Sequence, residues 1–201
     1  MTVTKQEQLD QLKREHARSC KHCGNQTGLN IVFGEGNPDA EVMFVGEGPG
    51  AEEDRLGRPF VGRAGQLLDK EIVAMGLKRE GVYIANVVKT RPPGNRVPTY
   101  EEAVICKPFL EKQIAIIQPK VVVALGATAA KYLLDDLRLA ITKERGKWKQ
   151  HNGYTVMPTF HPAYLLRQVN REAHAMVWSD LKAVLGKLGR PIPARNDKAT
   201  K

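Results

Sequence analysis

The 201-residue sequence has few cysteines, no long hydrophobic run and no internal repeat. Its 3 cysteines are an odd number, which does not suggest a disulfide framework and favours a reducing compartment. No run of about 18 apolar residues could span a membrane, and no apolar signal segment follows Met1, so we expect a cytoplasmic protein with no membrane partner. No linker divides the chain, and its length predicts one domain with a single core.

The composition that is present is that of an ordinary globular protein with a basic balance. Hydrophobic residues make up 42% of the chain and charged residues 26%, and 31 Lys and Arg oppose 22 Asp and Glu. The resulting net charge of +9 attracts polyanions, although many basic proteins bind none, so it supports a nucleic-acid partner only weakly. Nothing in the sequence indicates an obligate oligomer, and we expect a monomer.

The most informative stretch runs from Gly46 to Asp69, GEGPGAEEDRLGRPFVGRAGQLLD. An apolar run at 41–45 precedes it as a buried strand, and a helix begins near its end. A glycine-rich loop between a strand and a helix is a common ligand-binding position in α/β proteins. Its carboxylates would repel phosphate, so a nucleotide cradle is a poor fit. The alternatives are a flexible acidic surface loop, which the large apolar Phe60 argues against, and a site for an electron-poor transition state and a flat ring.

The hydrophobic periodicity predicts alternating strands and helices. Strands are expected at 41–45, 81–89, 119–126 and 154–160, with a short strand near 31. The stretches 141–148 and 154–160 suggest a hairpin, or an edge strand plus the fourth core strand. Helices are expected at 2–18, 63–76, 100–118, 126–134 and 171–188. This order predicts an α/β fold, a three-layer α/β/α sandwich around a central four-stranded parallel sheet. We expect a surface helix in 1–19, the main domain in 20–188 and a basic, disordered tail in 189–201.

Polar side chains follow the ends of the predicted parallel strands and should therefore meet at one edge of the sheet. Glu47, Asn86 and His161 are such residues, with Gly126 after the third strand and Phe60 in the acidic loop. Taken singly, each could cap a turn or a helix or brace a loop. Together they match a flat heterocycle that is extruded from a nucleic acid. A carboxylate stabilises an oxocarbenium-like sugar, and a histidine can hydrogen-bond a departing anionic base.

The cysteines form a second group of candidate functional residues. Cys20-Lys-His-Cys23 is a CxxC pair, a strong metal or redox signal when further soft ligands exist. Cys106 alone would be taken for a small buried hydrophobic residue. A redox or metal-storage protein is therefore an alternative, although it leaves the acidic loop unexplained.

Several segments in the same order resemble the family 4 uracil-DNA glycosylases, the iron–sulfur type of bacteria and archaea. They are GEGPGAEED at 46–54, GRPFVG at 57–62, NVVK at 86–89, RPPGNR at 91–96 and HPAYLLR at 161–167. The resemblance covers about 20–188. It implies a glycosylase-like catalytic domain that hydrolyses the N-glycosidic bond of uracil in DNA, releases uracil and leaves an abasic site for base excision repair of deaminated cytosine.

The resemblance also assigns roles at the predicted site. Glu47 would position or activate water, with Glu53 in a supporting role, and His161 would donate to uracil O2 as negative charge develops there. Asn86 would pair with the polar edge of uracil and reject cytosine, while Phe60 stacks on the base. The implied catalytic residues are Glu47, His161 and Glu53, and the implied uracil-binding residues are Glu47, Gly48, Pro49, Phe60, Asn86 and His161.

Contacts to DNA follow from the resemblance in the same way. The loop 162–167 would enter the minor groove beside the flipped nucleotide, with Leu165 or Leu166 as the wedge. Phosphate contacts would come from Lys89, Arg91, Arg96 and Arg167. Related proteins trap uracil-DNA through a histidine in a longer basic insertion, and the short turn at 91–98 has no histidine. A catalytically silent DNA- or nucleotide-binding protein remains the alternative function.

The implied cofactor is a 4Fe-4S cluster, which the family holds with four cysteines. Three of the four positions are occupied by Cys20, Cys23 and Cys106, and the fourth is Thr90. A hydroxyl is a hard, poor substitute for thiolate on iron. Three outcomes are open: an outside or nearby fourth ligand such as His22, His16 or a carboxylate; a 3Fe-4S or labile cluster; or a site that is empty or holds zinc. We favour the iron–sulfur cluster, with a structural role.

Overall fold

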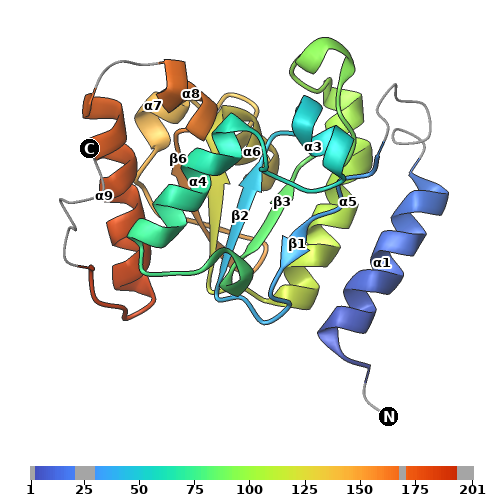
Figure 1. Ribbon diagram of the computed structural model, residues 1–201, viewed down its shortest axis with the longest axis horizontal. Helices are drawn as coiled ribbons and strands as arrows, with labels where there is room; N and C mark the ends of the chain where they lie inside the picture. Colours follow the sequence, from blue (N-terminus) through green and yellow to red (C-terminus); the bar gives the residue numbers. More distant parts are fainter. Residues whose placement is uncertain (1–2, 21–29, 168–170, 194–201) are drawn as a thin grey trace.

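The computed structural model describes residues 3–20, 30–167 and 171–193 (Figure 1). It contains one sheet whose strands lie in the order β1-β3-β2-β4-β6-β5. The strands are β1 (Glu35–Gly36), β2 (Val42–Gly46), β3 (Tyr83–Asn86), β4 (Val121–Leu125), β5 (Lys149–His151) and β6 (Tyr154–Thr159). Neighbouring strands among β3, β2, β4 and β6 are parallel, and the edge strands β1 and β5 pair antiparallel.

The predicted α/β class is confirmed, and the predicted four-stranded parallel sheet is the centre of a larger, mixed sheet. The edge strands are only 2 and 3 residues long, which is too short for an alternating pattern to appear in the sequence. The strand expected near residue 31 forms instead at Glu35–Gly36. The expected edge strand beside the fourth core strand is present, because β5 pairs antiparallel with β6. It forms at Lys149–His151 and not within 141–148, which begins with a short helix.

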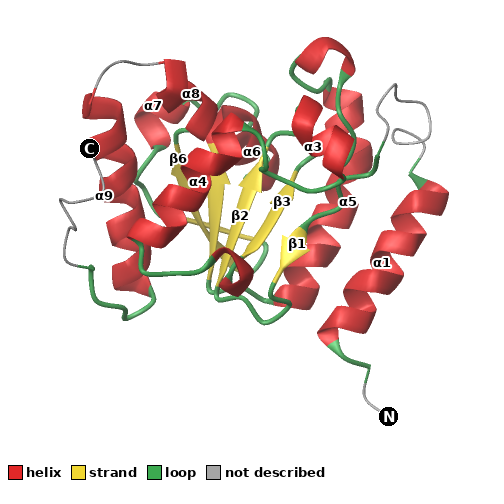
Figure 2. Cartoon of the chain, in the orientation of Figure 1, coloured by secondary structure: helices red, strands yellow, loops and turns green. Residues whose placement is uncertain are grey.

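The helices cover both faces of the sheet, which confirms the three layers (Figure 2). The described helices are α1 (Lys5–Ser19), α3 (Ala51–Leu56), α4 (Arg63–Ala74), η1 (Arg79–Gly81), η2 (Pro93–Asn95), α5 (Tyr100–Ile117), α6 (Gly126–Leu133), α7 (Ile141–Glu144), α8 (Pro162–Arg167) and α9 (Arg171–Lys187). Side chains alternate along β2, so that Met43 packs towards α5 and α6 while Phe44 packs towards α4 and α9. Among the described helices, none has both the length and the apolar character needed to cross a membrane.

Helix α1 lies outside the main layers and packs against α5 (Figure 1). A capping box between Thr4 and Glu7 fixes its start, which satisfies backbone groups that the first turn leaves without helical partners. Leu9 and Leu12 are buried, as their spacing on one helix face predicts. The helix therefore presents a charged face to solvent and an apolar face to α5.

The described part of the C-terminal segment corrects the predicted start of the disordered tail. Arg190 forms an ion pair with Glu41, with 2.6 Å between Nη2 and Oε2, at the entry to β2. Its backbone N–H also donates to the carbonyl of Leu185. The chain is thus ordered past 189, and 194–201 lies outside the described residues.

A buried ion pair holds α9 against the end of β6. Asp180 on α9 is 2% exposed, and it accepts hydrogen bonds from Arg145 Nε at 3.0 Å and from Thr159 Oγ1 at 2.6 Å. Desolvation raises the pKa of the Asp180 carboxyl group, while Thr159 and Arg145 oppose this rise. Thr159 ends β6 two residues before His161, so this pair helps to place the strand end.

We expect Asp180→Ala to lower the free energy of unfolding by about 3 kcal/mol, because it leaves the partly buried Arg145 guanidinium without its partner carboxylate. Urea denaturation followed by circular dichroism measures the change. Ser179→Ala is the matched control, since Ser179 is an exposed neighbour on the same helix. Equal stability of the two variants would contradict the structural role of the pair.

Candidate functional site

The acidic loop after β2 contains a short helix. Residues 51–56 form α3, and the carboxylate of Glu53 is bound by the backbone of its own loop. Its Oε1 accepts from the N–H groups of Val61 and Gly62 at 2.9 and 2.7 Å, and its Oε2 accepts from Gly50 at 3.2 Å. These bonds favour a positioning role for Glu53 over the catalytic role that was predicted for it.

Arg79 holds the part of this loop at Pro59 and Phe60 by hydrogen bonds to the backbone. Its guanidinium donates to the carbonyls of Pro59 and Phe60 at 2.6 and 3.1 Å, and forms ion pairs with Glu35 and Asp69. Phe60 has a φ of 51°, which a residue with a large side chain rarely adopts. Such strain persists where surrounding contacts determine the conformation, as it does at many functional sites. The sequence gives no signal for Arg79, because it lies in a short turn-like helix after α4.

Phe60, Asn86 and His161 are brought together at the carboxyl end of β2. A Cβ added to Gly46 would lie 2.4 Å from Cζ of Phe60 and 2.5 Å from Oδ1 of Asn86, so only glycine permits this approach. The rings of Phe60 and His161 have centroids 5.7 Å apart. The predicted convergence of these side chains is present, and Gly46, which the sequence did not single out, makes it possible.

Asn86 offers a buried hydrogen-bond acceptor. Its side chain is 1% exposed, and no hydrogen-bond partner for Oδ1 exists among the described residues. A buried amide oxygen without a donor is unfavourable by about 1–3 kcal/mol, so such an atom indicates either strain or a binding function. Beside an aromatic ring, this atom suits an N–H group on the edge of a flat ligand.

His161 is held as a neutral hydrogen-bond donor. Its Nδ1 accepts from the backbone N–H of Ala163 at 3.0 Å, so the proton of the neutral ring is on Nε2. Desolvation, with a smaller contribution from Arg167, lowers the pKa of His161 to about 4, and Glu53 opposes the change. At neutral pH the ring is therefore uncharged, with one N–H available for donation.

Glu47 lies directly after β2, and its carboxylate is held by Thr128. The hydroxyl of Thr128, in the first turn of α6, donates to Oε2 of Glu47 at 2.5 Å. One carboxylate oxygen is thereby fixed, which orients the other. Thr128 was not predicted, although its position after the third parallel strand places it at the same edge as Glu47.

The predicted DNA contacts divide into buried and exposed side chains. Lys89 is fully buried and donates to Gln113 and to the carbonyl of Asn86, so the prediction of a phosphate contact is wrong for Lys89. Arg96 is exposed and forms a bidentate pair with Glu102. Arg91 donates to Asn95 at the surface.

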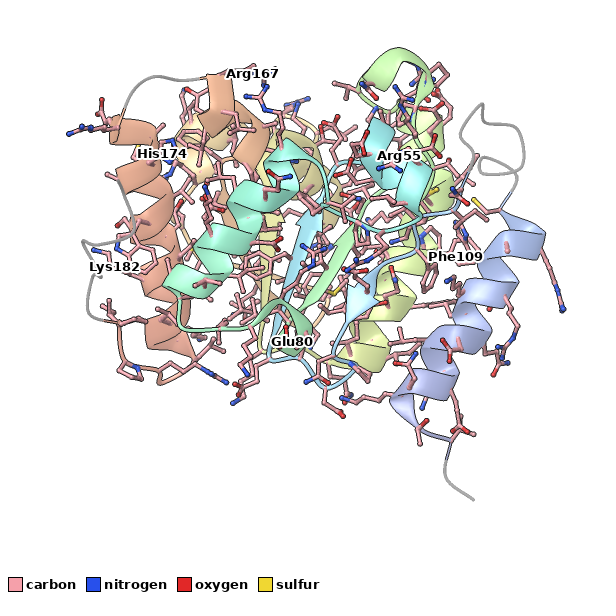
Figure 3. All side chains as sticks on the ribbon, in the orientation of Figure 1. Arg55, Glu80, Phe109, Arg167, His174 and Lys182 are labelled. Carbon is pink, nitrogen blue, oxygen red and sulfur yellow. The ribbon has the colours of Figure 1, made fainter. Side chains whose placement is uncertain are left out.

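The predicted loop 162–167 is the short helix α8, which begins with Pro162, a residue favoured at the first position of a helix. Leu165 is 1% exposed, whereas Leu166 is 42% exposed. Arg167 lies at the surface at the end of α8 (Figure 3). Of the two leucines predicted as a wedge, only Leu166 is available to a partner in this structure.

A second cluster lies between α1 and α5. The Sγ atoms of Cys20 and Cys106 are 3.8 Å apart, and these atoms and a ring nitrogen of His16 all lie within 4.8 Å of one another. All three residues are buried. Thiols and imidazole are the donors that zinc and iron–sulfur clusters take, so the set fits such a group. Thr90 is 2% exposed, and Cys23 lies outside the described residues.

Comparison with known proteins yields several matches over most of the chain. Residues 33–182 match the family described as the Uracil DNA glycosylase superfamily. The chain is 50% identical over 182 residues to a type-4 uracil-DNA glycosylase of Thermotoga maritima, covering 88% of this chain and 93% of the relative. It is 41% identical over 200 residues to a type-4 uracil-DNA glycosylase of Archaeoglobus fulgidus, covering 95% and 98%. A type-5 uracil-DNA glycosylase of Pyrobaculum aerophilum is 34% identical over 146 residues, covering 65% and 64%.

Proposed function

This chain belongs to the uracil-DNA glycosylase superfamily, and we propose that it releases uracil from DNA by hydrolysing the N-glycosidic bond, as a monofunctional enzyme of base excision repair. The observation that carries the proposal is the buried acceptor of Asn86, which lies beside Phe60 and His161. Its surroundings suit a flat base that has been turned out of the DNA stack.

Recognition of uracil rests on the amide of Asn86. Oδ1 accepts from the N3–H group of uracil, and the amide NH₂ donates to O4. Cytosine offers an unprotonated N3 and an amino group at these places, so both bonds would be lost and the buried amide would stay unpaired. A site that binds by hydrogen bonds discriminates strongly for this reason. Phe60 stacks on the base and completes the pocket.

Departure of the base rests on His161. When the bond between C1′ and N1 breaks, its electron pair goes to the base, and negative charge spreads to O2. The Nε2–H of the neutral imidazole donates to O2 as this charge develops. A donor fixed in advance stabilises a transition state more than water does, because it needs no reorganisation.

Attack by water rests on Glu47. The carboxylate, oriented by Thr128, accepts a hydrogen bond from a water molecule and stabilises the positive charge on the sugar. The water oxygen bonds to C1′, its proton passes to the carboxylate and then to solvent, and the released base regains a proton at N1. The products are free uracil and an abasic site.

A gel assay tests this function against a silent DNA-binding protein. Duplex oligonucleotides with uracil, cytosine or thymine at one position are incubated with the protein and then treated with alkali, which cleaves abasic sites. We expect cleavage at uracil alone. Binding to all three without cleavage would favour the silent alternative.

Binding to duplex DNA is proposed to use α8. Leu166 is exposed at its end and would fill the space left by the flipped nucleotide, with Arg167 against a phosphate and Arg91 as a further basic contact. The net charge of +9 suits this partner, and we propose that the protein acts as a monomer in the cytoplasm.

We expect Leu166→Ala to slow uracil release from duplex DNA about ten-fold and to affect single-stranded DNA much less. Unstacking a base is unfavourable by a few kcal/mol in a duplex, and this contribution is absent in a single strand. Single-turnover rates on both substrates measure the effect. Leu137→Ala is the control, since Leu137 is 50% exposed before α7. Equal loss on both substrates would contradict a wedge role.

The cysteine cluster is proposed to hold an iron–sulfur cluster of the 4Fe-4S type. Cys20, Cys23 and Cys106 would supply three thiolates, of which the described pair is close enough to share one metal group. When bound, the group would tie the end of α1 to α5 through metal–sulfur bonds. None of these cysteines is assigned to uracil, and the role of the group is structural.

A further inference from the structure

We propose that His16 is the fourth protein ligand of this iron–sulfur cluster, in place of a fourth cysteine. The proposal rests on the cluster proposed above. It assigns a metal-binding role to a histidine of α1 that lies beside Cys20 and Cys106.

The ring of His16 lies close to the sulfur atoms of two cysteines. A ring nitrogen of His16 and the Sγ atoms of Cys20 and Cys106 lie within 4.8 Å of one another, although Cys106 is far away in the sequence. His16 precedes Cys20 by four residues, so both lie on the same face of the helix. The N–H of Cys20 donates to the carbonyl of His16 and keeps the helix regular up to the cysteine. One helical turn therefore delivers two soft donors to the same point.

The imidazole ring of His16 is buried between aromatic side chains. His16 is fully buried. Its ring packs edge to face against Phe109, with 4.7 Å between the ring centroids, and its centroid lies 5.8 Å from that of Phe33. Phe109 stands on α5 facing α1 (Figure 3). These contacts fix the plane of the imidazole beside the two sulfur atoms.

His16 and Thr90 differ in how well their donor atoms suit iron. The competing residue, Thr90, offers a hydroxyl, which is a hard ligand that binds iron only when deprotonated. Imidazole replaces thiolate in known iron–sulfur centres, where it raises the reduction potential because the neutral ligand removes one negative charge. His16 is thus the better donor near the described cysteines. The alternative is a purely structural role, in which His16 only packs between two phenylalanines.

The test uses the full chain, purified without oxygen, as wild type, His16→Ala, His16→Cys and Thr90→Ala. Iron and sulfide per chain, pulsed EPR of the oxidised and the reduced protein and the reduction potential are measured, and uracil release is assayed on the same batches. We expect ¹⁴N coupling from a bound imidazole in wild type and in Thr90→Ala. His16→Ala should lose most of its iron or show the EPR signal of a three-iron cluster. His16→Cys should keep its iron, lose the coupling and have a more negative potential.

His174→Ala is the matched control, because His174 is exposed on α9 (Figure 3). Wild-type iron content and potential in both His16 variants would overturn the proposal, as would loss of the cluster in Thr90→Ala alone. If His16→Ala fails to fold, His16→Cys decides, because an unchanged potential and spectrum would exclude ligation. Wild-type protein without iron would overturn the cluster and this ligand together, whereas uracil release by that protein would leave the glycosylase proposal standing.

Discussion

Replacing Glu47 by glutamine is expected to lower kcat for uracil release by about 10²–10⁴-fold, the range typical for loss of a group that accepts a proton in the transition state. Glutamine keeps the size of the side chain and can still meet the hydroxyl of Thr128, but it neither accepts the proton of water nor stabilises the positive sugar. Single-turnover release from a uracil oligonucleotide under saturating enzyme measures the change. Affinity for the same DNA should remain close to that of wild type.

Glu52→Gln is the control for this prediction. Glu52 lies in the same acidic loop, is exposed and pairs with Arg55 at the surface. We expect kcat to be essentially unchanged in Glu52→Gln, because the site keeps its carboxylate. Similar losses in both variants would mean that the loop acts through its overall charge, and the specific role of Glu47 would be wrong.

Replacing His161 by alanine is expected to lower kcat by about 10²–10³-fold, as the loss of one fixed donor to a developing anion does elsewhere. The variant should keep most of its DNA affinity, since the bond to uracil O2 strengthens mainly as the base departs. Pre-steady-state release rates measure the loss, and His174→Ala, on the exposed face of α9, serves as the control. Equal rates in His161→Ala and wild type would contradict the assignment.

The pH dependence gives a second result for His161. Because burial lowers its pKa to about 4, the ring of the free enzyme is neutral above about pH 5, and kcat/KM should show no inflection at the usual histidine value of about 6.5. Protonation begins only as the pH falls towards 4. An inflection near 6.5 that His161→Ala removes would show that the ring is charged in the active enzyme, contrary to the donor geometry with Ala163.

The long, apolar elements of the fold could be predicted from the sequence. The run 119–126 contains β4, and the run 154–160 contains β6, because strands buried on both faces show continuous hydrophobic stretches. Edge strands of 2 and 3 residues carry no such pattern. α8 was mistaken for a loop, because a six-residue helix that starts at proline leaves little periodicity.

The candidate site was predictable where it depends on strand ends and not where it depends on contacts across the fold. Glu47, Asn86 and His161 follow from the topology, since parallel strands end at one edge. The burial of Lys89 depends on Gln113 of α5, which no local pattern reveals. Similarly, Thr128 becomes significant only once β2 and β4 are known to be neighbours.

The cysteine cluster was also predictable only in part, where it depends on local sequence and not on contacts across the fold. The CxxC pair is a local signal, and Cys106 comes close to Cys20 only through the packing of α1 on α5. His16 was one of several possible ligands in the sequence. Its burial beside the two sulfur atoms singles it out, because helix spacing and helix packing act together there.

We propose that this chain hydrolyses the bond between uracil and deoxyribose. The most direct measurement is the release of free uracil from a uracil-containing duplex, quantified by mass spectrometry against the abasic sites formed in the same reaction. We expect one uracil and one abasic site per cleaved position, many turnovers per protein molecule, and no release of cytosine or thymine. Folded, iron-loaded protein that binds this DNA and releases no uracil would contradict it.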